Sequence, residues 1–416
     1  MKICVLGMGH LGVVTAVCLA ADGHDVAGLD PDPGVIERLT HGEPPVIEPG
    51  LSELLASHPP AFTTDVGVVG DVDVVWLADD TPVDEDDVAD IGWVLDRART
   101  ALGAARDGVL VIVSSQLPAG TVASLETAHP RLRFACLPEN LRLGRAVETF
   151  RSPERVVVGT RDEATRVDMG RVLAPYAGRI VWMSIESAEL TKHALNAFLA
   201  TSVSFANELA GICEVTGADM RDVERALRSD PRVGPSAYVA AGPPFSGGTL
   251  ARDVEYLRAL GREGERPTAL LDGVAAANES HRGWARRWLA AADPNVAAVW
   301  GIAYKPGTES TRRSEAVALC TWLLERDVQV RVHDPLVRIL PESLAGSVVA
   351  AASPLDATVG ADALVVAVAS PEYSAVPADK VASTMARPRV LDPAGTTAAT
   401  LGRHPGIEYT TVGVRA

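Results

Sequence analysis

Short apolar runs alternate with stretches of helical periodicity in the first part of the chain. Short strands separated by amphipathic segments are typical of a parallel sheet with helices on both faces. We therefore expect a Rossmann-like, doubly wound α/β domain over residues 1–185. The apolar runs that predict its strands are 2–6, 25–29, 72–77, 109–113 and 133–136.

A long helical pattern follows, from about Glu186 to Val215, with Gly217 as its stop signal. A helix of about 30 residues spans roughly 45 Å, which is more than one domain of this size needs. We expect this helix to join two domains and to present a dimer surface. Helical patterns continue to about residue 290, which predicts a helical central domain over 186–290.

The last part of the chain repeats the alternating pattern, which predicts a second Rossmann-like domain over 291–416. The expected fold class is therefore α/β. It has two doubly wound parallel-sheet domains joined by a long central helix and a helical middle domain. The predicted elements of the last domain are strands at 296–302, 328–332, 363–368 and 388–391, and a helix at 314–326.

The composition of the chain argues against several classes of function. The formal net charge is −16 and no lysine- and arginine-rich run occurs, so we expect no nucleic-acid partner. No uninterrupted run of eighteen apolar residues is present, and glycines break the stretch after Lys2, so we expect a cytoplasmic protein without a membrane span or signal peptide. Five scattered cysteines indicate reduced core thiols and no metal site. The acidic run at 84–87 is expected to be a solvated loop.

A dinucleotide-binding pattern lies at the start of the chain. Three glycines follow the first predicted strand and open a helix, and an acidic residue closes the next strand. In this arrangement the diphosphate sits on the helix N-terminus, and the carboxylate binds the adenosine ribose and disfavours a 2′-phosphate. We therefore predict NAD as the cofactor. The expected binding residues are Gly7, Gly9, His10, Leu11, Gly12 and Asp30.

Lysine is rare in this chain, with four lysines among 38 basic residues. Where arginine is used so freely, a retained lysine indicates a site that needs a compact or deprotonatable amine. Lys192 and Asn196 are four residues apart in the predicted long helix, so they share one face. The alternative is an ordinary polar stripe on a helix.

Four segments resemble the UDP-glucose and GDP-mannose dehydrogenases, and they follow the same order over nearly the whole chain. The resemblance implies an NAD-dependent nucleotide-sugar dehydrogenase and a homodimer built on the central helix. The segments are GPPFSGGTLARD at 242–253, LPENLRLG at 137–144, KHALN at 192–196 with FANE at 205–208, and GIAYKP at 301–306 with Thr308 and Arg312.

The resemblance also implies roles for individual residues. Hydride transfer from an alcohol needs a proton acceptor and a dipole that steadies the developing alkoxide. Lys192 is implied to supply positive charge, Asn196 an amide donor, and Asp253 a route for the proton through water. Glu139 matches the carboxylate that the family places around a thioester and its water. The other implied contacts are Leu141, Arg232, Phe245, Gly247 and Lys305 for the nucleotide sugar, and Thr81 and Arg312 for the cofactor.

Three positions depart from the family pattern. Thr249 stands where the family has its nucleophilic cysteine, Leu143 replaces a carboxylate, and Gln116 replaces a threonine that holds water. A thiol ionises near neutral pH and can hold an aldehyde for a second oxidation, whereas a hydroxyl cannot do so without a strong base. All three departures lie at positions that the family associates with its second half-reaction, which ends in hydrolysis. Pro244 and Ser246 replace loop glycines, so a changed sugar pocket is expected.

Three interpretations of the protein's function remain open. The first is a dehydrogenase that oxidises a secondary alcohol once, to a ketone, similar to dehydrogenases of lincosamide antibiotic pathways that act on C6 of a GDP-linked octose. The second is an epimerase that retains NAD, and the third is a non-catalytic nucleotide-sugar-binding homologue. Whether the base is guanine or uracil is also open.

Overall fold

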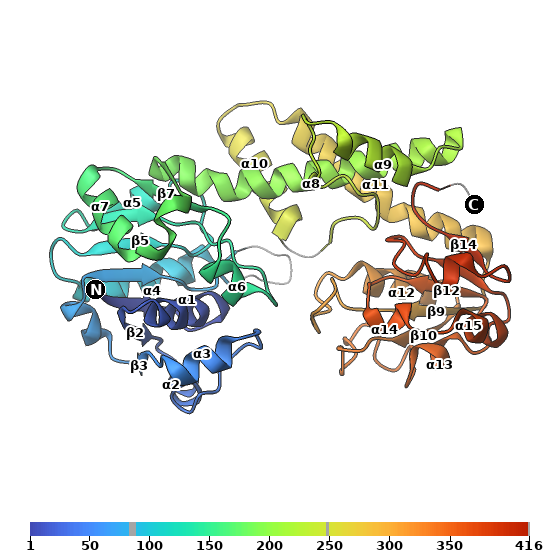
Figure 1. Ribbon diagram of the computed structural model, residues 1–416, viewed down its shortest axis with the longest axis horizontal. Coiled ribbons are helices and arrows are strands. Elements are labelled where there is room, and N and C mark those ends of the chain that lie inside the picture. The colour runs from blue at the N-terminus through green and yellow to red at the C-terminus, as the bar shows by residue number, and fades with distance from the viewer. Residues whose placement is uncertain (83–88, 247–248, 415–416) are drawn as a thin grey trace. The chain divides into compact units, whose positions relative to one another are not determined.

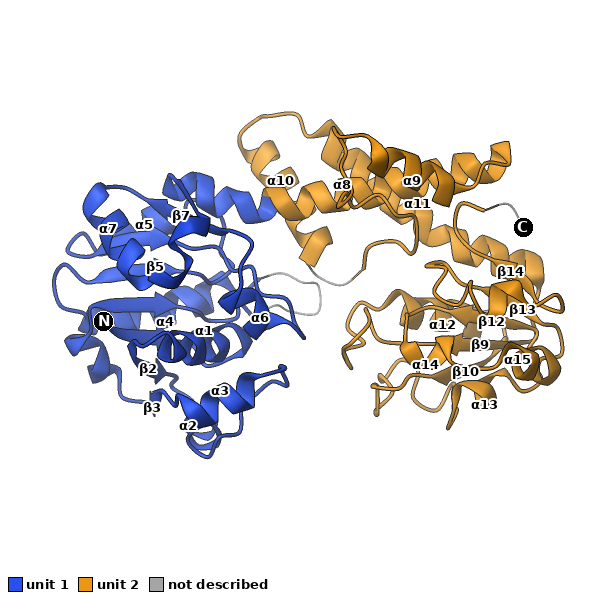
Figure 2. Cartoon of the chain, in the orientation of Figure 1, with its two compact units in different colours: residues 1–193 blue, residues 194–416 orange. Residues whose placement is uncertain are grey.

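The computed structural model describes residues 1–82, 89–246 and 249–414, and the chain divides into two compact units (Figures 1 and 2). Unit 1 is Met1–His193 and unit 2 is Ala194–Ala416. The acidic run at 84–87 and Gly247 lie outside the described residues. The three predicted domain boundaries remain predictions.

Unit 1 is built on an eight-stranded sheet with the order β3-β2-β1-β4-β5-β6-β7-β8. The order reverses at β1, which pairs with β2 on one side and with β4 on the other. Such a reversal leaves a crevice at the carboxyl ends of the two strands, where open α/β sheets bind ligands. The strands are β1 (Lys2–Leu6), β2 (Asp25–Leu29), β3 (Ala61–Thr63), β4 (Val74–Leu77), β5 (Leu110–Val113), β6 (Arg133–Cys136), β7 (Val156–Thr160) and β8 (Ile180–Met183).

Helices cover both faces of this sheet, as the alternating apolar pattern predicts (Figure 1). In β1 the side chains of Ile3 and Val5 enter one hydrophobic core, and those of Cys4 and Leu6 enter the other. A strand buried on both faces therefore reads as one continuous apolar run. The helices are α1 (His10–Ala21), α2 (Pro33–Thr40), α3 (Leu51–Ser57), α4 (Ile91–Ala104), α5 (Thr121–Ala128), α6 (Ala146–Arg151) and α7 (Glu163–Val172), with 3₁₀ turns η1 (Val66–Asp71) and η2 (Ala174–Arg179).

One strand pair departs from the predicted parallel sheet. β7 runs antiparallel to β6, and β8 then pairs parallel to β7. Between β6 and β7 the chain forms only the short helix α6 and loops, so it turns back beside β6 and makes no parallel crossover.

The long helix α8 (Ile185–Thr216) begins in unit 1 and continues in unit 2, close to the predicted span. In unit 2 it is followed by α9 (Met220–Ser229), α10 (Thr249–Glu263) and α11 (Ala269–Ala292). No helix among the described residues is both long enough and apolar enough to cross a membrane.

The second sheet has six parallel strands in the order β11-β10-β9-β12-β13-β14. Its order also reverses, here at β9, and buried cores lie on its two faces. The strands are β9 (Val296–Trp300), β10 (Gln329–His333), β11 (Val349–Ala350), β12 (Ala363–Val366), β13 (Arg389–Leu391) and β14 (Glu408–Thr410). The helices are α12 (Glu315–Leu324), α13 (Pro354–Thr358), α14 (Pro371–Ser374) and α15 (Ala378–Thr384), with the 3₁₀ turn η3 (Leu401–Arg403).

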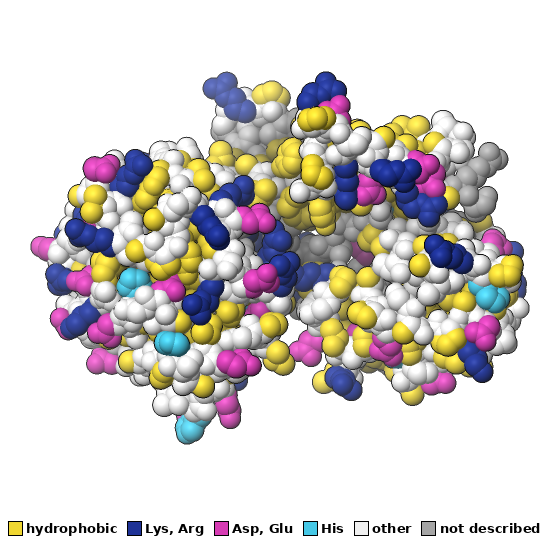
Figure 3. All heavy atoms as spheres, in the orientation of Figure 1, with side chains coloured by type: hydrophobic (Ala, Val, Ile, Leu, Met, Phe, Trp, Pro, Cys, Tyr) yellow, Lys and Arg dark blue, Asp and Glu magenta, His cyan; other side chains and the backbone are white. Residues whose placement is uncertain are grey.

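Acidic and basic side chains are both spread over the visible face of each unit (Figure 3). A mixed surface of this kind, on a chain of net charge −16, offers no extended basic stripe on that face.

Candidate active site

The turn between β1 and α1 is built from glycine for a geometric reason. Gly7 has φ +90°, and a Cβ there would lie 2.4 Å from a carboxylate oxygen of Asp79. A Cβ at Gly12 would lie 1.6 Å from the carbonyl oxygen of Gly7, so the first turn of α1 could not pack against the strand end. The glycines therefore give the tight turn and the close helix packing that the sequence pattern predicts.

Asp30 lies directly after β2 and is 8% exposed. Its carboxylate accepts hydrogen bonds from the backbone amides of Met8 (2.9 Å) and Asp32 (3.0 Å). Arg97 on α4 lies 3.1 Å from the same carboxylate and 2.8 Å from that of Asp79. Asp30 is thus held at the sheet crevice, beside the glycine turn, where a ribose-binding carboxylate belongs.

Two further carboxylates, Asp79 and Asp80, follow β4 and were not predicted as site residues. Burial raises the pKa of Asp79 to about 6 and outweighs the opposing effect of Arg97. Burial also raises the pKa of Asp80, whose carboxylate accepts hydrogen bonds from the backbone amides of His10 (2.6 Å) and Leu11 (3.4 Å). The amides of two predicted cofactor-binding residues of α1, His10 and Leu11, therefore contact an acidic side chain of the chain itself.

Glu48 connects the glycine turn to the segment at 137–144. Its buried carboxylate lies 2.9 Å from the His10 ring and accepts hydrogen bonds from the backbone amides of Gly144 (2.7 Å) and Ala146 (3.1 Å). Leu141 packs against the same hydrophobic core of unit 1, whereas Leu143 is exposed. Glu48 therefore fixes this loop relative to α1.

A small cavity of about 30 Å³ lies beside the first turns of α8 within unit 1. A volume of that size accommodates a water molecule. The Ser115 hydroxyl is buried and has no hydrogen-bond partner among the described residues. The predicted residue Thr81 donates its hydroxyl to the carbonyl of Gln116 at 2.8 Å. The polar residues that line the cavity are Ser114, Ser115, Gln116, Glu139, Glu189, Lys192 and His193.

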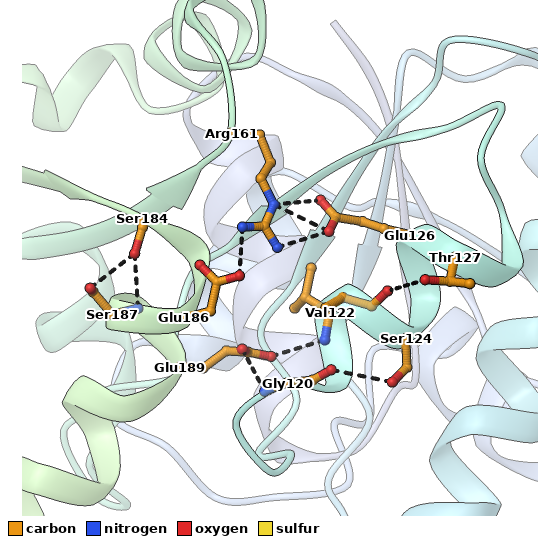
Figure 4. Close-up of polar contacts among 11 residues, drawn as sticks. Gly120, Val122, Ser124, Glu126, Thr127, Arg161, Ser184, Glu186, Ser187 and Glu189 are labelled. Carbon is orange, nitrogen blue, oxygen red and sulfur yellow. Dashed lines mark hydrogen bonds and ion pairs between the residues drawn. The ribbon is translucent and has the colours of Figure 1, made fainter.

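Glu189 anchors the start of α8 to the rest of unit 1 (Figure 4). Its carboxylate accepts hydrogen bonds from the backbone amides of Gly120 (2.8 Å) and Val122 (2.9 Å) at the N-terminus of α5. One turn earlier, Glu186 pairs with Arg161, which also pairs with Glu126 on α5. The first turns of α8 therefore have a fixed position relative to the cavity.

Lys192 follows Glu189 by three residues and lies on the same face of α8. Its Nζ is 3.4 Å from a carboxylate oxygen of Glu139, and both side chains are largely buried at 16% and 20% exposure. The structure thus brings together two of the predicted catalytic residues, from the helix and from the loop after β6, within unit 1.

In unit 2, Asn196 donates its side-chain amide to the carboxylate of Asp253 on α10. Asp253 is 1% exposed and Asn196 is 6% exposed. Thr249 is the first residue of α10 and is exposed, four residues and about one helical turn before Asp253. The predicted polar group of unit 2 is thus a buried amide–carboxylate pair with the threonine at the open end of its helix.

Phe245 and Ser246, a few residues before Thr249, are held by hydrogen bonds between side chains and backbone. Asn278 on α11 accepts from the amide of Phe245 (3.0 Å) and donates to its carbonyl (3.1 Å). Ser246 donates its hydroxyl to the carbonyl of Tyr304 (3.1 Å), which joins the loop to the segment at 301–306. Phe245 itself is 8% exposed and packs in the core of the helical region.

The remaining predicted substrate and cofactor residues lie at the surface of unit 2. Lys305 Nζ is 5.4 Å from the centre of the Tyr304 ring, a cation–π contact. Arg232 has a side chain 90% exposed and pairs with Asp230 at 2.8 Å. Arg312 lies in the loop before α12, where its backbone amide donates to Ser310 at 3.5 Å. No cluster of metal-ligating side chains occurs among the described residues.

Several residues that hold the candidate site in place were not predicted from the sequence. They are Glu48, Asp79, Asp80, Arg97, Glu189 and Asn278. Asp79 and Asp80 carried a usable signal, because they follow an apolar run that ends at residue 77, where the carboxyl end of a strand meets the crevice. Glu189 and Asn278 gave no such signal in the sequence, since single polar residues on long helices are ordinarily solvated.

Comparison with known proteins identifies all three parts of the chain. Residues 1–177 match the NAD binding domain of the UDP-glucose/GDP-mannose dehydrogenase family, residues 186–280 its central domain, and residues 298–398 its UDP binding domain. A UDP-glucose 6-dehydrogenase of Pseudomonas aeruginosa is 34% identical over 398 residues, covering 88% of this chain and 87% of that protein. One from Rhizobium meliloti is 33% identical and covers 94% of each.

Solved structures agree with the sequence matches. A UDP-glucose dehydrogenase from Pyrobaculum islandicum superposes with a TM-score of 0.86 at 29% identity, covering 100% of this chain and 98% of that one. A UDP-D-ManNAc dehydrogenase from Pyrococcus horikoshii gives 0.85 at 26% identity, with 99% of each chain covered.

Proposed function

The chain belongs to the UDP-glucose/GDP-mannose dehydrogenase family, with an NAD-binding domain, and we propose that it oxidises a secondary alcohol of a nucleotide sugar once, to a ketone. The observation that carries the proposal is the residue at position 249. A threonine, exposed at the start of α10, stands where the resemblance places a nucleophilic cysteine. A threonine at this position supplies no thiolate to hold an aldehyde for a second oxidation.

The chemistry of a single oxidation needs few groups. NAD, held at the glycine turn and Asp30, would supply the hydride acceptor for the carbinol carbon, and the chain's own residues would take up the hydroxyl proton. Lys192 supplies a positive charge that steadies the developing alkoxide, and Asn196 supplies an amide donor. Asp253, buried and already bound to Asn196, accepts the proton through water.

Glu139 has a role in this scheme that needs no thioester. Its carboxylate lies 3.4 Å from Lys192 Nζ inside a largely buried site. A neighbouring carboxylate fixes where a partly buried ammonium group points. The chain keeps Glu139 although it lacks the cysteine. This combination is consistent with an enzyme that performs only the first oxidation.

The numbering of the oxidised carbon suggests the class of sugar. Relatives of this chain are named UDP-glucose 6-dehydrogenases, and C6 of a hexose is a primary alcohol. In a sugar of more than six carbons C6 is a secondary alcohol, so oxidation at the same carbon stops at a ketone. We therefore propose a higher-carbon substrate such as a GDP- or UDP-linked octose, which places the enzyme with sugar-modifying steps of antibiotic biosynthesis. Pro244 and Ser246 in the sugar-side loop support a changed pocket.

An epimerase that retains NAD is the second candidate function, because oxidation followed by reduction also needs no nucleophile. A non-catalytic binding protein is the third. The buried Asn196–Asp253 pair and the Lys192–Glu139 pair count against the third, because binding alone needs no group that moves a proton.

The test is a substrate panel with product analysis. Purified enzyme and NAD are offered UDP-glucose, GDP-mannose and GDP- and UDP-linked octoses, and products are treated with hydroxylamine, which traps a ketone as an oxime. NADH and a trapped ketone from an octose support the dehydrogenase. A new epimer without NADH supports the epimerase, and tight sugar binding without any product supports the binding protein.

A further inference from the structure

The anion-binding end of α1 already holds an anion that belongs to the chain. The first helical residue is His10, and its amide donates to Asp80 at 2.6 Å, while the amide of Leu11 lies 3.4 Å from both carboxylate oxygens. The N-terminus of an α-helix favours a negative charge because its amides are unpaired and its dipole is positive there. In the dinucleotide-binding pattern these same amides face the diphosphate.

The carboxylate also fills the space that the second glycine opens. A Cβ at Gly9 would lie 2.2 Å from Asp80 Oδ2. Glycine is needed at this position so that backbone and diphosphate can approach closely. In this chain the group within that distance is the side chain of Asp80.

Other carboxylates lie close to this charge. Asp79 is 2% exposed, and its Oδ2 is buried without a hydrogen-bond partner in the part of the chain that the structure describes. Arg97 is shared between Asp79 and Asp30, and the His10 ring is engaged by Glu48. Arg97 thus pairs with two of the three aspartates around the turn, Asp30 and Asp79, and a bound diphosphate would add further negative charge.

We propose that Asp80 is a built-in competitor of the cofactor diphosphate. NAD binds only when the Asp80 side chain leaves the N-terminus of α1, so part of the binding free energy is spent on displacing it. The same carboxylate returns when the dinucleotide leaves. This lowers the affinity for both NAD and NADH and favours exchange of the cofactor after each turnover.

The binding argument stands on the NAD domain alone, and only its catalytic consequence rests on the proposed single oxidation. A dehydrogenase must release NADH after each cycle, whereas an epimerase retains the cofactor. If the sugar chemistry proposed above is wrong, the competition between Asp80 and diphosphate is unaffected, because it is measured without sugar.

The test compares three ligands by titration calorimetry on wild type, Asp80→Asn and Asp80→Gly. NAD and ADP-ribose carry the diphosphate, and adenosine does not. Both variants are expected to lower the Kd of NAD and ADP-ribose about tenfold, equivalent to about 1.4 kcal/mol, with that of adenosine unchanged.

Asp162→Asn is the matched control. Asp162 caps α7 in unit 1 by accepting from the Thr165 amide at 2.7 Å, so its loss lowers the melting temperature and leaves the Kd of ADP-ribose unchanged. An unchanged or weaker ADP-ribose affinity in both folded Asp80 variants overturns the proposal. A crystal structure of wild type with ADP-ribose gives an independent check. Asp80 is expected to have left the His10 amide, and a retained hydrogen bond beside bound diphosphate also overturns the proposal.

Discussion

Asn196 on α8 donates its side-chain amide to the carboxylate of Asp253 on α10, and both side chains are buried. The two residues are 57 positions apart, so the contact is formed by packing of the two helices within unit 2. A buried carboxylate that accepts a hydrogen bond is held in place and keeps its accepting lone pairs oriented. The proposed proton route is built on this pair.

Asp253→Asn is expected to lower kcat about 10²- to 10⁴-fold, the range of a lost proton-transfer group. An amide of the same size preserves packing, so the Kd of NAD should not change. Asp272→Asn is the control, because Asp272 is a half-exposed carboxylate on α11 that pairs with Arg258. Full turnover of Asp253→Asn with the correct substrate would remove Asp253 from the mechanism.

Lys192→Ala is expected to reduce kcat strongly, again about 10²-fold or more, while the Kd of NAD stays within a factor of two. Lys192→Arg keeps the charge but not the compact ammonium group beside Glu139, so it should restore little activity. Initial rates at saturating substrate give the comparison. Lys380→Ala, at an exposed site on α15, is the matched control and should behave as wild type. Intact turnover of Lys192→Ala would contradict the assignment.

Thiol reagents are expected to leave the wild-type enzyme active. All five cysteines are buried, and burial raises the pKa of Cys4, Cys18 and Cys320 to about 12 and that of Cys136 further still, so the reactive thiolate is scarce. Iodoacetamide followed by an activity assay and intact-mass measurement checks this expectation.

Thr249→Cys provides the positive control for the thiol experiment. Position 249 is exposed at the N-terminus of α10, where a thiol ionises readily. We expect one rapid alkylation in this variant and none in wild type over the same time. Rapid inactivation of wild type would mean that one of the native cysteines takes part in catalysis.

A homodimer built on α8, as predicted, requires an apolar contact surface along that helix. Large apolar side chains lie exposed along it at intervals of seven residues, at Phe198 (67%), Phe205 (51%) and Ile212 (58%). Residues at this spacing fall on one stripe of a helix and are typical of a helix–helix interface. Phe205→Glu is expected to convert a dimer into a monomer by light scattering after gel filtration. Leu270→Glu on α11, also exposed at 70%, should leave the dimer intact. A monomeric wild type would refute the interface.

The sequence predicts best what depends on local spacing. The glycine turn, Asp30 and the span of α8 follow from short patterns with a direct physical cause, and the structure has them where expected. The antiparallel β6–β7 pair was missed, because periodicity does not reveal the direction in which a strand pairs.

Contacts between site residues that lie far apart in the sequence could be predicted only in part. The family resemblance suggested Asn196 and Asp253 together, whereas spacing alone could not join residues so far apart in the chain. Glu189 was missed because it acts on the N-terminus of α5, which is distant in sequence. A carboxylate that caps another element looks, in the sequence, like any solvated acid.

The most direct test of the central claim is the yield of NADH per molecule of nucleotide sugar consumed, with the product identified. We predict one NADH per substrate and a ketone. Two NADH per substrate and a carboxylic acid would contradict the account, because a second oxidation would then proceed without a cysteine at position 249.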